Sequence, residues 1–207
     1  MAPHPAGRDG PSVSDIFADL PHRLTETATI EDLIAALGGR AHGLTVAAVS
    51  IPAIVPTPGI PAGLVFGTIL AVFAAQITTG ASSVILPRWL AYRPVSPRVL
   101  DALAGRGSSL VWRVERFTRS RLTHVASPAS MRWLGPFLFL LGLLIALPIP
   151  FGNTLPGLGA LLIGVGIASR DGLVVLYGLA VGVAGLIVSL GLIYGGWRVA
   201  SSFLGGA

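Results

Sequence analysis

The chain has 207 residues, of which 53% are hydrophobic and 27 are glycine, while only 14 arginines and 9 acidic residues carry a formal charge. Residues 41–87, 133–169 and 172–197 contain no charged side chain, and uncharged apolar runs of this length belong in lipid. We therefore expect an integral membrane protein rather than a water-soluble domain. The absence of cysteine excludes disulfides and cysteine-bound metals.

Residues 1–43 are expected to form a tail followed by two amphipathic surface helices. Ser14 is expected to cap the first helix, which Pro21 interrupts. Thr29 is expected to cap the second helix, and Gly38–Gly39 to end it. The apolar stripes of both helices fit the membrane surface or the core of the protein equally well.

Residues 44–87 form the first predicted membrane unit, in which a proline-rich stretch separates two apolar arms. The arm 44–55 would reach about 18 Å as a helix, well short of the hydrocarbon layer of about 30 Å. The arm that follows spans as far as residue 85 or is a half-helix that ends near Gln76. Prolines remove backbone donors and restrict the preceding residue, so the connection is not expected to continue as a helix. The prolines concerned are Pro52, Pro56, Pro58 and Pro61.

Residues 88–132 form an arginine-rich connector that carries nine arginines and two acids. The positive-inside rule places such a segment in the cytoplasm. Because the positive excess is confined to this connector, we do not expect nucleic-acid binding. We expect a basic interfacial helix with Trp112 at headgroup depth, and contacts with anionic lipid headgroups through four of the arginines. These are Arg88, Arg93, Arg113 and Arg116.

Residues 133–172 repeat the design of the first unit. Two short apolar arms flank PIPFGNTLP, which has the order Pro-x-Pro, Gly, Pro that is also found in PTPGIP at 56–61. Each second arm ends in a polar cluster and a glycine. We interpret the two units as an internal repeat, with broken or re-entrant helices or, alternatively, plain hairpins that have proline at their tips.

Residues 173–207 contain one long apolar run, 173–195, which is sufficient for a full transmembrane helix. Gly178 and Gly182, and likewise Gly191 and Gly195, have the GxxxG spacing that permits close helix approach. A homodimer is expected, because two such units in one small chain rarely enclose a roomy path. The predicted fold is therefore an all-α integral membrane protein with two repeated helical hairpins, amphipathic interfacial helices and a long C-terminal transmembrane helix.

The order of these features resembles the ExoD family of bacterial inner-membrane proteins. The resemblance runs over roughly residues 12–195 and is most specific in PIPFGNTLPGLG and ASRDGL, within Pro148–Asp171. It implies a multi-pass protein of the bacterial inner membrane linked to exopolysaccharide production, with polysaccharide-synthesis proteins as candidate partners. The resemblance supplies no biochemical activity.

Half-helices that begin after the proline breaks would direct free amides and positive dipole ends toward an anionic group. The sequence therefore favours a transporter or flippase-like carrier for a lipid-linked phosphate or a polyanion. The predicted substrate-binding residues are Thr57, Gly59, Gln76, Gly152, Asn153, Thr154, Arg170 and Asp171. The predicted helix breaks are Pro56, Pro58, Pro61, Pro148, Pro150 and Pro156.

Arg170 and Asp171 also fit a polar turn between two spans. A scaffold protein of a polysaccharide-synthesis complex is the alternative function, and an ion or proton antiporter is a third, for which Asp171 is the single acid near the membrane. The sequence shows no paired acids, catalytic triad or metal-ligand pattern, so we expect neither an enzyme nor a cofactor.

Overall fold

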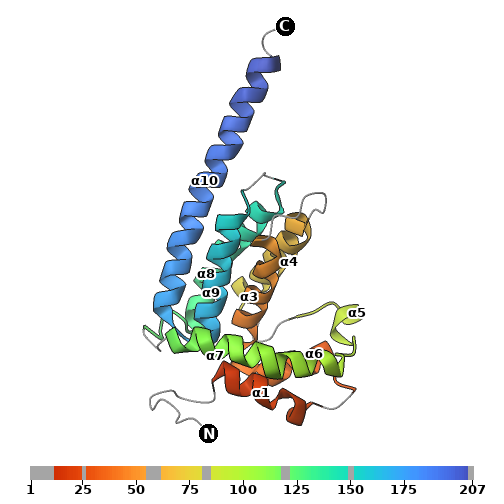
Figure 1. Ribbon diagram of the computed structural model, residues 1–207. Helices are drawn as coiled ribbons and strands as arrows, with labels where there is room; N and C mark the ends of the chain where they lie inside the picture. The colour runs from red at the N-terminus through yellow and green to blue at the C-terminus, as the bar shows by residue number, and fades with distance from the viewer. Residues whose placement is uncertain are drawn as a thin grey trace.

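The computed structural model describes residues 12–24, 27–54, 62–80, 85–117, 122–148 and 152–204, and within these residues it is helical and contains no strand. A bundle of longer helices stands on a layer of shorter helices that crosses its lower end (Figure 1). The bundle consists of α3 (Ala41–Ile54), α4 (Ala62–Thr78), α8 (Pro128–Ala146), α9 (Thr154–Ser169) and α10 (Gly172–Leu204). The all-helical class is confirmed.

The lower layer, called the platform below, is built from two separate parts of the chain, residues 13–40 and 88–117. It comprises α1 (Val13–Arg23), α2 (Ile30–Leu37), η1 (Gly38–Arg40), α5 (Arg88–Ala91), α6 (Pro97–Ala102), the π-helical turn η2 (Leu103–Gly107) and α7 (Ser108–Phe117). α6, η2 and α7 follow one another directly and α1 packs against them. Val13, Phe17 and Leu20 of α1 are buried in this contact, so its apolar stripe docks on the protein.

The ends of α1 differ from the sequence prediction. Ser12 caps the helix, because its hydroxyl accepts from the Asp15 backbone N–H while the Asp15 carboxylate accepts from the Ser12 N–H, and Ser14 is buried inside the helix. Pro21 does not interrupt α1, which continues to Arg23. A proline in the last turn removes only one backbone hydrogen bond. The capped first turn and the buried apolar stripe stabilise the remainder of the helix.

The start and end of α2 agree with the prediction. The Thr29 hydroxyl accepts from the Asp32 backbone N–H, and Asp32 accepts from the backbone and hydroxyl of Thr29, which lowers the pKa of the Asp32 carboxyl. Gly38 has φ +56° and ends α2. η1 then leads into α3, which continues through Pro52 to Ile54, so Pro52 lies inside a helix and is not part of the break.

Two helical hairpins form the bundle. α3 leaves the platform and α4 returns to it, and α8 and α9 do the same (Figure 1). α3 packs mainly against α9, and α4 packs mainly against α8, so the hairpins interlock. Glycines permit this: a Cβ atom on Gly43 would lie 2.5 Å from the Ala168 backbone nitrogen, and one on Gly142 would lie 2.6 Å from the Ala71 nitrogen.

α10 is the longest helix and extends well beyond the hairpins (Figure 1). Its lower half packs against the bundle through Gly178, Gly182 and Gly185. Two segments are long and apolar enough to cross a membrane, Gly172–Arg198 in α10 and Ile30–Ile54, although the second is turned at Gly38. The long C-terminal helix is thus confirmed.

Candidate functional site

The connection between α8 and α9 carries the polar residues nearest the upper end of the bundle. Gly152 and Asn153 form a turn before α9, which begins at Thr154, and Pro156 is buried in the first helical turn. The Asn153 side chain does not cap the helix. Its Oδ1 atom is buried and accepts no hydrogen bond, and it is the one such side-chain atom among the described residues. A buried carbonyl oxygen without a donor is costly and calls for an explanation.

The Asn153 side chain belongs to the second hairpin but packs against the first. A Cβ atom on Gly63, at the start of α4, would lie 2.3 Å from Asn153 Nδ2 and 2.8 Å from the carbonyl oxygen of Ile145. No side chain fits there, so Gly63 is the position at which α4 receives the asparagine amide. The two hairpins therefore meet at their tips.

The long helix α10 completes this group of residues. The Ser189 hydroxyl is fully buried and donates a hydrogen bond of 3.0 Å to the carbonyl oxygen of Gly152. We call Gly63, Gly152, Asn153 and Ser189 the tip cluster. It joins α4, the α8–α9 turn and α10, and it contains one unsatisfied acceptor, Asn153 Oδ1.

Several of the predicted residues near the hairpin tips are not part of the tip cluster. Pro148 follows α8 and is exposed, while Thr154 is exposed at the first residue of α9. The remaining predicted tip residues lie outside the described residues: Pro56, Thr57, Pro58, Gly59, Pro61 and Pro150.

Arg170 and Asp171 lie at the opposite end of the bundle, in the turn between α9 and α10. Arg170 adopts the left-handed conformation with φ +54° and is exposed. Asp171 is 2% exposed, and its carboxylate accepts from the backbone N–H groups of Leu173 and Val174 at 3.0 and 3.4 Å, so it caps α10. The 16 residues of α9 separate this turn from the tip cluster by about 24 Å.

Gln76 also lies toward the platform end, near the end of α4. Its Nε2 donates to the carbonyl oxygen of Ile85 and its Oε1 accepts from the Ile85 N–H, both at 3.0 Å. The side chain therefore holds the backbone that follows residues 81–84. Those predicted substrate residues that the structure describes thus divide between two ends of the bundle and do not form one site.

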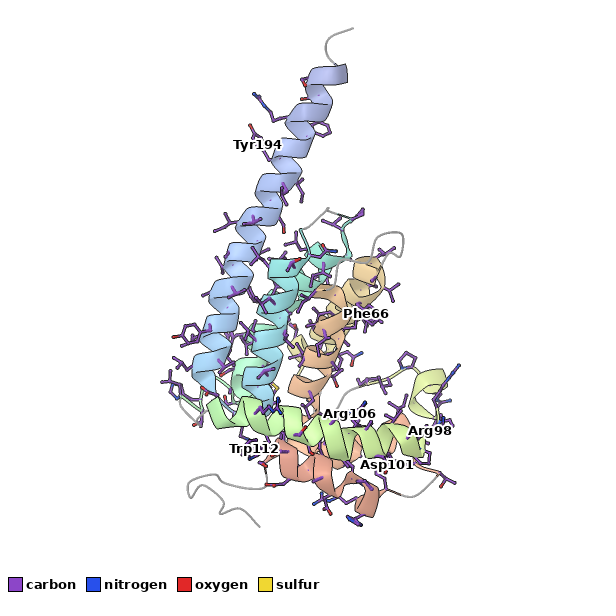
Figure 2. The ribbon with its side chains drawn as sticks, viewed as in Figure 1. Phe66, Arg98, Asp101, Arg106, Trp112 and Tyr194 are labelled. Atoms are coloured by element: carbon purple, nitrogen blue, oxygen red, sulfur yellow. The ribbon has the colours of Figure 1, made fainter. Side chains whose placement is uncertain are left out.

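The predicted lipid-contact arginines lie on the platform. Arg88, Arg93 and Arg113 are exposed, and Arg116 belongs to α7, although its side chain is outside the described part. Figure 2 shows Arg98, Asp101, Arg106 and Trp112 along the α6–α7 segment. The described residues contain no group of three or more histidine, aspartate or glutamate side chains that could hold a metal ion.

Sequence reasoning missed two residues of the tip cluster, Gly63 and Ser189. A signal for Ser189 exists in the sequence, because the serine continues the series Gly178, Gly182, Gly185 at intervals of three to four residues on one face of α10. A small polar residue in a series of packed glycines indicates a contact with another backbone. The role of Gly63 has no comparable signal, since it depends on a residue 90 positions away.

Comparison with known proteins matches residues 13–191 to the family model described as "Exopolysaccharide synthesis, ExoD". The chain belongs to the ExoD family. It is similar to Protein ExoD of Rhizobium meliloti (strain 1021), with 32% identity over 155 residues that cover 72% of this chain and 63% of that protein. This ExoD family member therefore aligns with less than two thirds of that relative's length. No solved structure matches the chain.

Proposed function

We propose that this ExoD family member is an integral protein of the bacterial inner membrane that carries an anionic, lipid-linked substrate in exopolysaccharide synthesis, without catalysing a chemical reaction. The link to exopolysaccharide synthesis rests on the family. The proposed activity rests on one observation, the unsatisfied Asn153 Oδ1 beside the N-terminus of α9. A saccharide phosphate would supply both hydroxyl donors for Oδ1 and an anionic oxygen for the backbone N–H groups of Thr154 and Leu155, since Pro156 has no N–H and the Gly157 N–H bonds the Asn153 carbonyl.

An internal repeat is part of the proposal, and two pairs of contacts support it. A Cβ atom on Gly43 of α3 would meet the backbone of α9 at Gly164 and Ala168, as one on Gly135 of α8 would meet α4 at Ala74 and Thr78. Gly135 lies 92 residues after Gly43, the same interval that separates Pro56 from Pro148.

Contacts at the other end of the hairpins agree with this repeat. A Cβ atom on Gly67 would lie 2.4 Å from the nitrogen of Ala146, and one on Gly157 would lie 2.8 Å from Cγ1 of Ile54. The first helices are then 92 residues apart and the second helices 90. Because both hairpins open toward the platform, the repeats would be parallel rather than inverted. The interval of 90 also disfavours equivalence of Pro61 and Pro156, which are 95 residues apart.

Substrate flux in proteoliposomes tests the proposed function. The probe is a fluorescent polyprenyl-phosphate analogue in phosphatidylethanolamine–phosphatidylglycerol vesicles, whose transfer between leaflets is followed by chemical quenching from outside. We expect Asn153→Leu to reduce the rate at least tenfold, with elution volume and thermal unfolding retained, and the exposed-site variant Ser201→Ala to leave it unchanged. Equal rates in the wild type, Asn153→Leu and empty vesicles would overturn the proposal.

A scaffold function is the second candidate, and the exposed arginines of the platform favour it. Under this alternative, co-purification with polysaccharide-synthesis proteins depends on Arg88, Arg93 and Arg113 and tolerates Asn153→Leu. The antiporter alternative loses its main residue, because the Asp171 carboxylate is engaged in capping α10.

A further inference from the structure

Exposed aromatic side chains mark two heights on α10. Tyr177 is 61% exposed near the platform, and Trp197 is 72% exposed near the far end, where Tyr194 is exposed too (Figure 2). The 20 residues from Tyr177 to Trp197 correspond to about 30 Å of helix, which is the thickness of the hydrocarbon layer. No charged residue lies between them. Tryptophan and tyrosine gather at the two boundaries of a membrane.

A second helix, α8, also carries an exposed aromatic side chain at the lower height. Trp133 of α8 is 84% exposed, the most exposed large hydrophobic side chain among the described residues. α8 and α10 run in the same direction, and a Cβ atom on Gly182 would lie 2.8 Å from the ring of Phe137. Counting down each helix from that contact brings Trp133 to about the height of Tyr177. The lower aromatic level therefore spans two helices.

Charge separates the two sides of this slab. Exposed arginines lie on and beside the platform, and at the far end Arg198 is the single described charge. The platform arginines include Arg88, Arg93, Arg98, Arg106, Arg113 and Arg132. This asymmetry identifies the platform with the cytoplasmic side and with anionic headgroups.

The height of the hairpin tips follows from their contacts with α10. Ser189 bonds Gly152, and a Cβ atom on Gly185 would lie 2.7 Å from the backbone nitrogen of Pro156. Ser189 lies eight residues below Trp197, or about 12 Å along the helix. The contact between Gly63 and Asn153 places the first hairpin at the same height.

We infer that the protein binds a lipid bilayer between these two aromatic levels, so that α10 alone crosses it. Both hairpins enter from the platform side, and their described residues Gly63 and Gly152 lie about 12 Å short of the far boundary. The lengths of α4 and α9, 17 and 16 residues, agree with incomplete crossing. The tip cluster then lies within the hydrocarbon layer, where an unsatisfied Asn153 is more costly than at a surface. This placement is independent of the carrier function.

Depth measurements along α10 test this placement, and the chain's lack of cysteine makes single labels unambiguous. Spin labels are attached at three exposed positions, Val183, Ile187 and Ile193, in phosphatidylethanolamine–phosphatidylglycerol vesicles. Relaxation by oxygen is compared with relaxation by a water-soluble nickel chelate. We expect Ile187, midway between Tyr177 and Trp197, to be deepest, with Val183 and Ile193 shallower.

A different order of depths would overturn the placement. If the label at Val183 is deepest and that at Ile193 lies at headgroup depth, the slab is centred nearer the platform, the tips reach the far surface and the placement is wrong. Membrane-impermeant thiol reagents provide the second readout, with cysteines at Ser109 on the platform and Ser201 beyond Trp197. Labelling of both from the same side would also overturn it. Neither readout depends on transport.

Discussion

The amide of Asn153 occupies the space in which a side chain at Gly63 would stand. A Cβ atom there would lie 2.3 Å from Asn153 Nδ2 and 2.8 Å from the backbone oxygen of Ile145, which cannot move away as a flexible side chain can. We expect Gly63→Ala to destabilise the protein by about 1–3 kcal/mol, as overpacking does. Thermal unfolding in detergent measures the change. Gly39→Ala is the control, because open space surrounds Gly39, and an equal loss in both variants would contradict the contact.

The unsatisfied Asn153 Oδ1 predicts separate effects on stability and activity. An apolar side chain of the same branched shape removes a desolvation cost of about 1–3 kcal/mol. We therefore expect Asn153→Leu to unfold at the same or a higher temperature than the wild type while losing flux. Unfolding at a markedly lower temperature would mean that the asparagine is structural.

The capping role of Asp171 at the start of α10 predicts different outcomes for two substitutions of this residue. Asp171→Ala removes the cap of α10 and is expected to cost about 0.5–2 kcal/mol, whereas Asp171→Asn retains an acceptor and most of the stability. Unfolding temperatures of the two variants provide the comparison. Equal losses in Asp171→Ala and Asp171→Asn would mean that the negative charge, and not the hydrogen bonds, is what matters.

Arg170 is in a conformation that costs an L-residue about 1 kcal/mol and glycine nothing. We expect Arg170→Gly to be as stable as the wild type or more so. If flux is also unchanged, Arg170 is only a turn residue. A loss of flux without a loss of stability would instead assign it a role in substrate capture.

The upper part of α10 offers a surface for the homodimer that the sequence leads us to expect. Open space surrounds Gly191 and Gly195, so leucine at either position leaves the packing of the protomer intact. If a second copy packs there, Gly191→Leu and Gly195→Leu shift the equilibrium toward monomer in cross-linking or analytical ultracentrifugation. Leu190→Ala, which changes the neighbouring exposed position, serves as the matched control. An unchanged distribution in all three would exclude this helix face as the dimer surface.

The sequence predicted the elements that depend on neighbouring residues. The cap at Thr29, the end of α2 at Gly38 and the long helix α10 follow from local signals. The cap at Ser12 was missed because two serines stand close together, and only the one three residues before Asp15 completes a capping box. The helix-breaking effect of Pro21 was overestimated, since a proline in the last turn of a helix removes only one backbone hydrogen bond.

The candidate site was predictable only in part. Asn153 stands in the proline-rich motif and was identified there. Its partners Gly63 and Ser189 were not, because a close approach between backbones is decided by tertiary packing rather than by local residue type. For the same reason the sequence grouped Gln76 and Arg170 with the tip residues, although the length of α9 separates the two ends.

The exchange of partners between the hairpins has a consequence during synthesis. α3 and α4 pack less against each other than against α9 and α8, which begin 113 residues after α3 and 66 residues after α4, respectively. At about 5–20 residues per second the first hairpin waits on the order of 5–20 s for its partners. During that interval the backbone around Gly43 and Gly67 has only lipid or an insertion factor to cover it. A chain that ends before α8 would leave the first hairpin without its packing partners, and we expect membrane quality-control proteases to degrade it.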